Sequence, residues 1–170
     1  MDAPDHLINE YISLLEKEIE SYRQFRDLLM EEQGILISGK IQEVHANVRK
    51  QEILAREIRR MEAFRNEKTN ELAKEFSLKK IPLMLRDIIK VAPDTWKERL
   101  VTLLEEFRYL VQDVVKLNRN NAKLIQNGIS FVQHYVEALY KIIDKDFFYH
   151  PQRKHSSKSE KIVRLVDRKI

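Results

Sequence analysis

The chain has 170 residues, among them 3 glycines, 4 prolines and no cysteine. This glycine content is too low for a Gly-rich phosphate loop, a Rossmann turn or a β-sandwich with many tight turns, and the lack of cysteine excludes disulfides and thiolate zinc sites. Charged residues make up 34% of the chain, which is typical of long helices. The net charge of +4 is uneven, because residues 150–170 carry +5 and residues 1–149 carry −1.

The first two predicted elements are long amphipathic helices. Apolar residues recur every three or four positions from about 5 to 37, and again from about 40 to 76, which predicts one helix in each range. Glu18 and Glu32 fall in the apolar register of the first helix and weaken it. A Ser-Gly pair at 38–39 separates the ranges, and glycine suits the left-handed residue that ends a helix. Because the connection is short, we expect an antiparallel hairpin.

A short helix and a very long one complete the prediction. Pro82 and Pro93 bracket an apolar segment, where we expect a short helix that turns the chain back. From 94 to about 145, a heptad stripe of fourteen positions is apolar at all but Asn121 and Gly128. A stripe of this length requires neighbouring helices along its whole length. A buried asparagine can fix helix alignment, and the helix-propensity cost of Gly128 is acceptable if a neighbouring backbone approaches closely there.

Together these elements predict an all-α fold. Residues 1–149 are expected to form an elongated antiparallel bundle of three long helices plus a short corner helix. Residues 150–170 are expected to form a flexible basic linker and a short amphipathic C-terminal segment. The N-terminus lacks the apolar core of a secretory signal, and no apolar run approaches the roughly 18 residues of a membrane span. We therefore expect a cytoplasmic protein that does not insert into membranes.

No residue set in the chain points to catalysis. The five histidines show no Glu-x-x-His or His-Glu-x-x-His spacing. His45 and His134 lie at the flanks of helical stripes, where a half-exposed structural histidine is favoured over a phosphorylated one. The basic tail has no aromatic residue for base stacking. We therefore expect no enzymatic activity, no cofactor, no metal and no nucleic-acid partner.

The second half of the last helix is unusually apolar, since residues 121–143 carry three charges in 23. A second apolar stripe lies beside the heptad stripe, and together they cover about 160° of the helix. Either helices of the same chain cover both stripes, or part of this surface is reserved for another protein's helix. For the second case, the predicted partner-binding residues are Asn118, Asn121, Leu124, Ile125, Ile129, Val132, Val136, Leu139, Ile143, Phe147 and Phe148, with Ile162, Val163, Leu165 and Val166 of the C-terminal segment.

The sequence resembles the FlgN family of flagellar export chaperones. The most specific stretch is Leu-Asn-Arg-Asn-Asn-Ala-Lys-Leu-Ile at 117–125, which is similar to the family's Leu-Asn-x-x-Asn-x-x-Leu-Ile run in the last helix. The residues 165–170 resemble the family's C-terminal Asp-x-Lys-Ala signature, with Ile170 in place of alanine. The first hairpin, with its turn at 38–39, also matches the family's pattern.

The resemblance implies a cytoplasmic chaperone without enzymatic activity. Members of the family bind hook-associated proteins of the hook–filament junction, prevent their premature assembly and deliver them to the flagellar type III export apparatus. The resemblance also implies that the C-terminal part of the chain binds the amphipathic terminal helices of these clients. For this role we expect a monomer. The alternative hypothesis is a structural coiled-coil subunit or adaptor that oligomerises through the same apolar surface.

Overall fold

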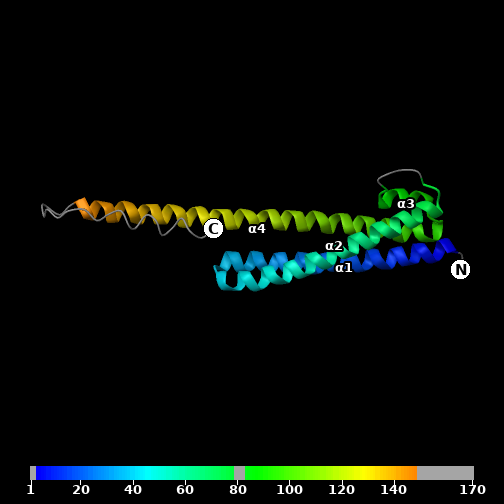
Figure 1. Cartoon of the computed structure of the whole chain (residues 1–170), viewed down its shortest axis with the longest axis horizontal. Helices are drawn as coiled ribbons and strands as arrows, with labels where there is room; N and C mark the ends of the chain where they lie inside the picture. The colour runs from blue at the N-terminus through cyan, green and yellow to red at the C-terminus, as the bar shows by residue number, and fades with distance from the viewer. Residues whose placement is uncertain (1–2, 79–82, 149–170) are drawn as a thin grey trace. The chain divides into compact units, whose positions relative to one another are not determined.

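In the computed structural model, which describes residues 3–78 and 83–148, the chain forms four helices (Figure 1). Side chains are described for residues 5–78 and 83–142. The helices are α1 (Ala3–Ser38), α2 (Ile41–Glu75), α3 (Leu85–Val91) and α4 (Asp94–Phe148). The predicted all-α class is confirmed, and the bounds of the three long helices agree with the predicted ranges to within a few residues.

The chain divides into two compact units, Met1–Asn127 and Gly128–Ile170. The first unit contains α1, α2, α3 and the part of α4 up to residue 127. The described part of the second unit is the remainder of α4, residues 128–148. The boundary expected between residues 149 and 150 lies outside the described residues and stays a prediction.

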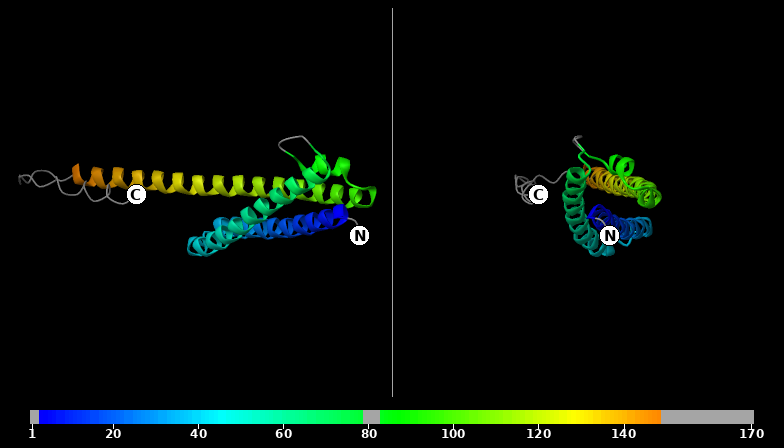
Figure 2. Two further views of the ribbon diagram at one scale, coloured as in Figure 1. Left: turned by 45° about the vertical axis from the view of Figure 1, so that its right-hand side comes forward. Right: turned by 90° about the vertical axis from the view of Figure 1, so that its right-hand side faces the viewer.

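The turn between α1 and α2 has the geometry that the glycine predicted. Gly39 adopts a left-handed φ of 69°. Its N–H donates to the carbonyl oxygen of Leu36 at 3.3 Å, and the N–H of Lys40 donates to that of Ile35 at 3.2 Å. This pair of bonds is the Schellman motif that ends helices. Figure 2 shows α1 and α2 side by side on the two sides of this turn, as the predicted antiparallel hairpin.

The end of α2 repeats this motif without a glycine. Ser77 has a φ of 52°, and its N–H donates to the carbonyl oxygen of Lys74 at 3.2 Å. The N–H of Leu78 donates to the carbonyl oxygen of Ala73 at 2.8 Å. A left-handed conformation costs an ordinary residue roughly 1–2 kcal/mol, so α2 ends in a conformation that serine tolerates poorly.

Substitutions at these two turns should shift stability in opposite directions. Ser77→Gly should raise the free energy of unfolding by about 1 kcal/mol, and Gly39→Ala should lower it by a similar amount. Gly34→Ala is the matched control, because Gly34 lies inside α1 and a Cβ there meets nothing within 4 Å. It should stabilise the helix. Urea unfolding followed by circular dichroism measures all three, and a Gly39→Ala chain as stable as Gly34→Ala would contradict the left-handed turn.

The core of the first unit lies between the N-terminal half of α1, the end of α2, α3 and the start of α4. The indole Nε1–H of Trp96 donates to Oδ1 of Asp5 at 3.0 Å, and Nδ2 of Asn121 donates to the carbonyl oxygen of Leu29 at 2.8 Å. These pairs follow the same order along both helices, so α1 and α4 run parallel, with α2 antiparallel to α1. The buried cluster is Ile8, Tyr11, Ile12, Leu15, Ile19, Leu72, Ile88, Ala92, Leu100, Leu103 and Leu110.

The short corner helix is confirmed as α3. Its first turn is held by Asp87, whose Oδ2 accepts a hydrogen bond from the N–H of Met84 at 3.2 Å. Ile88 is fully buried and anchors α3 to the core. Ala92, in extended conformation before Pro93, ends the helix, as expected for a residue that precedes proline.

Two carboxylates lie on the buried face of α1 and do not interrupt it. Glu18 is 0% exposed, and its Oε2 accepts a hydrogen bond from Nε of Arg65 at 2.7 Å. Glu32 is 6% exposed and accepts a hydrogen bond from Nδ2 of Asn121 at 2.8 Å. The expectation was that these acids weaken the apolar face of the helix. In the structure, each instead accepts a hydrogen bond from a donor on another helix.

Candidate partner-binding surface

The heptad stripe of α4 begins as a buried face of the first unit. Leu100 and Leu103 are 0% and 2% exposed, and Leu110 and Val114 are also buried. Asn121, at 1% exposure, is the last buried position on α4 among the described side chains. Up to this point, the stripe is covered by helices of the same chain, as the sequence predicted.

From Ile125 to Ile142, the apolar face of α4 is exposed. Exposure ranges from 41% at Ile125 to 73% at Phe131. At 3.6 residues per turn, these side chains cover about 180° of the helix surface. The neighbouring helices that a stripe of this length calls for are therefore not supplied to this part of α4 by the described part of the chain. The exposed apolar side chains are Ile125, Ile129, Phe131, Val132, Tyr135, Val136, Leu139, Tyr140 and Ile142, and we call them the α4 face.

The electrostatics of this segment favour burial against another apolar surface. Between 125 and 142, the charged residues are Glu137 and Lys141. His134 is exposed, and its Nδ1 lies 2.6 Å from the carbonyl oxygen of Ser130 in its own helix. A partner that covers the α4 face therefore desolvates little charge, whereas burying charges would cost several kcal/mol. Three of the side chains are aromatic and supply large contact areas.

The structure brings five of the predicted binding residues together on the α4 face. They are Ile125, Ile129, Val132, Val136 and Leu139. Leu124 is half-buried beside it, and Asn118 is exposed. The side chains of Ile143, Phe147 and Phe148 lie outside the described residues, as do Ile162, Val163, Leu165 and Val166, and all seven stay predictions.

Asn121 is the predicted binding residue that the structure places in the interior. Its Nδ2 donates to the carbonyl oxygen of Leu29 and to Oε2 of Glu32, both at 2.8 Å. From α2, Nδ2 of Asn47 donates to the neighbouring carbonyl oxygen, that of Leu28, at 3.1 Å. Two asparagines therefore hold consecutive carbonyls of α1, and Asn121 presents no surface to a partner.

The aromatic part of the α4 face was missed by sequence reasoning. Phe131, Tyr135 and Ile142 lie on the heptad stripe but were not among the predicted binding residues, and neither was Tyr140. Helix length carried the missing signal, because the predicted first helix spans 33 residues and the last one about 52. A helix cannot cover a partner so much longer than itself. Gly128 is exposed, and a Cβ there meets nothing within 4 Å, so close approach of a backbone does not explain this glycine.

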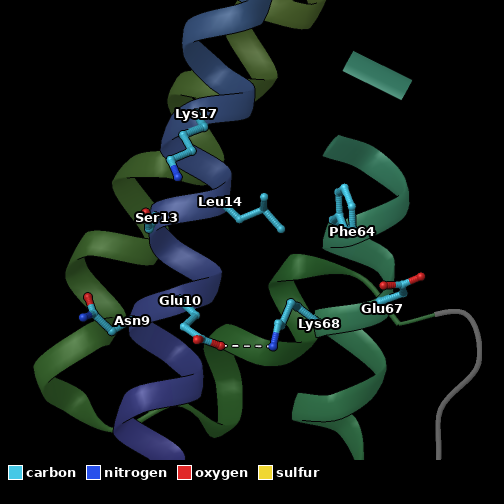
Figure 3. Close-up of a pocket in the computed structure, with 8 residues that line it drawn as sticks. All are labelled: Asn9, Glu10, Ser13, Leu14, Lys17, Phe64, Glu67 and Lys68. Atoms are coloured by element: carbon cyan, nitrogen blue, oxygen red, sulfur yellow. Dashed lines mark ion pairs between the residues drawn. The ribbon is translucent and has the colours of Figure 1, made fainter. Parts of the chain in front are cut away.

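A second apolar feature is a hollow between α1 and α2 in the first unit. In Figure 3, Leu14 of α1 and Phe64 of α2 face each other across it, and the ion pair between Glu10 and Lys68, 3.0 Å long, lies at one end. The hollow measures about 480 Å³. Lys17 and Glu67 add one charge of each sign.

Within residues 3–78 and 83–148, no group of three or more His, Asp or Glu residues is placed to hold a metal ion. Over the same part of the chain, none of the helices combines the length and apolar character needed to cross a bilayer.

Comparison with known proteins finds one family. A family model described as FlgN protein matches residues 1–157 of the chain. No curated protein and no solved structure matches.

Proposed function

Because the chain belongs to the FlgN family of flagellar export chaperones, we propose that it binds hook-associated proteins of the hook–filament junction in the cytoplasm. It prevents their premature assembly and delivers them to the flagellar type III export apparatus. The observation that supports this proposal most directly is the α4 face, an uncovered apolar surface on a helix whose earlier turns are buried.

The α4 face suits a client segment that is itself an amphipathic helix. Such a segment buries one apolar face and keeps its polar face in water, so one client helix laid along α4 meets apolar side chains over about four to five turns. This recognition needs no chemistry beyond apolar burial. We also propose that four residues of the C-terminal segment contact the bound client, namely Ile162, Val163, Leu165 and Val166. Their ordering on binding would lower the affinity and allow release of the client.

The test is a polar replacement in the middle of the face. Val132→Gln, Val136→Gln and Leu139→Gln together should weaken binding of a purified hook-associated protein about 30- to 100-fold, because the contact loses three apolar side chains near its centre. All three positions are exposed, so the melting temperature should stay within experimental scatter. Isothermal titration calorimetry gives the affinity.

The matched control lies on the polar side of the same helix. Gln126→Ser and Gln133→Ser change exposed side chains over the same turns and should leave the affinity for the client unchanged. Equal affinity of the triple variant and the wild type would contradict the proposal. Sedimentation equilibrium tests the alternative hypothesis of a structural coiled-coil subunit. A tight wild-type dimer that is lost in the triple variant would assign the α4 face to self-association.

A further inference from the structure

A second stripe runs along α4 within the first unit. Its members recur at steps of three or four and fall within about 80° of the helix surface. They are Val101, Leu104, Arg108, Val111, Val115, Arg119 and Ala122. Leu104 and Val111 are half-buried, Val101 is 40% exposed and Val115 is 61% exposed. The described helices therefore leave this stripe partly open, although its spacing is that of a helix–helix seam.

The charged residues on and beside the C-terminal half of this stripe are basic. Arg108, Lys116, Arg119 and Lys123 are all exposed, and none has an ion pair within the described part of the chain. Between residues 107 and 127, Asp113 is the single acid, and it lines a hollow between α1 and α4 that Lys116 also lines. We call Arg108, Val115, Lys116, Arg119 and Lys123 the basic stripe.

Near the start of α4, charged side chains form ion pairs with α1 or within α4 itself. Arg99 pairs with Glu16 of α1, and Glu106 pairs with Arg23 of α1. Lys97 pairs with Asp94 at 2.8 Å within α4 itself. Against this pattern, the basic stripe carries four uncompensated charges along 16 residues, a length of about 23 Å.

We propose that the basic stripe binds an acidic amphipathic helix of another protein. A helix that carries carboxylates at three- and four-residue spacing matches the cations along the stripe, and its apolar residues cover Val115 between them. The valine favours a protein partner over a nucleic acid, because a phosphate backbone gains nothing from apolar contact. The basic stripe shares no residue with the α4 face.

The test reverses charges in the chain and, separately, in a peptide that represents the partner. The probe is a designed 21-residue helical peptide with leucine at alternating steps of three and four and flanking glutamates. The chain variant is Lys116→Glu, Arg119→Glu and Lys123→Glu. Fluorescence anisotropy should show at least tenfold weaker peptide binding to this variant than to the wild type. A peptide with lysine in place of glutamate should show the opposite preference.

The matched control moves the same charge change to α2. Arg56→Glu, Arg59→Glu and Arg60→Glu replace exposed arginines without an ion pair among the described residues, and should leave binding of the acidic peptide unchanged. The stripe variant should also keep wild-type affinity for a hook-associated client, which separates this surface from the α4 face. Equal binding of a scrambled acidic peptide, or tighter binding of duplex DNA or phosphatidylserine vesicles through the same lysines, would overturn the proposal.

Discussion

Arg65→Ala is expected to lower the free energy of unfolding by about 3 kcal/mol at neutral pH. Glu18 is 0% exposed, and its Oε2 accepts a hydrogen bond from Nε of Arg65 at 2.7 Å. The arginine side chain is itself 23% exposed. Removing it leaves a carboxyl group in the core without its counter-charge, and that group must either stay charged at high cost or take up a proton. Chemical denaturation measures the loss.

The same carboxyl group predicts a pH dependence. Burial raises the pKa of Glu18 above its ordinary value, against the opposing effect of Arg65. Between the unfolded and the folded pKa, the folded chain binds the proton and the unfolded chain does not, so stability falls as the pH rises through this interval. Without Arg65 the folded pKa rises further. The stability difference between Arg65→Ala and the wild type should therefore shrink at acid pH, where Glu18 is neutral in both states.

An exposed ion pair on the same two helices is the control. Lys68 of α2 pairs with Glu10 of α1 at 3.0 Å, with side chains 32% and 43% exposed. Since water screens such a pair, Lys68→Ala should cost far less than Arg65→Ala. Glu18→Leu combined with Arg65→Met should recover most of the stability, because both charges are removed together. Equal losses for Arg65→Ala and Lys68→Ala would show that Glu18 is solvated.

Local chemistry explains why the helices could be predicted from the sequence. The three-four periodicity, the glycine at 39 and the proline at 93 act over a few residues, and each sets a helix or its end. Glu18 and Glu32 were misread because their partners are distant in sequence. Arg65 lies 47 positions from Glu18, and Asn121 lies 89 positions from Glu32. Periodicity identifies a polar residue within an apolar stripe but not the donor that satisfies it.

The candidate surface was half predicted for a related reason. Ile125 and Val132 could be predicted because they lie outside the heptad stripe. Contact with a single neighbouring helix needs only the heptad stripe, so these two apolar residues pointed to a further partner. Phe131 and Tyr135 lie on the stripe itself and were not among the predicted binding residues. A hydrophobic pattern determines which side of a helix is apolar. Whether another helix reaches that side depends on the lengths and directions of the neighbours, which periodicity does not contain.

Asn121→Ala is expected to lower the free energy of unfolding by about 2–3 kcal/mol, because it removes the donor to Glu32 and leaves that carboxyl group buried. The two hydrogen bonds of its Nδ2, both 2.8 Å long, hold α4 against Leu29 and Glu32 of α1. Asn118→Ala is the matched control, because that side chain is exposed. It should change stability by no more than about 0.5 kcal/mol.

Asn121→Leu combined with Glu32→Leu tests the alignment separately from stability. An apolar pair fills the same space without unpaired polar groups, so the free energy of unfolding should return to the wild-type value or exceed it. The heptad stripe then has nothing polar to set its register, and α4 can shift by seven residues to place Val114 or Gly128 opposite Leu29. A shift that draws Gly128 inward also buries the start of the α4 face. We therefore expect several sets of amide resonances in NMR spectra and a weaker affinity for the client in a stable chain. A single set of resonances with wild-type affinity would show that apolar packing alone aligns the two helices.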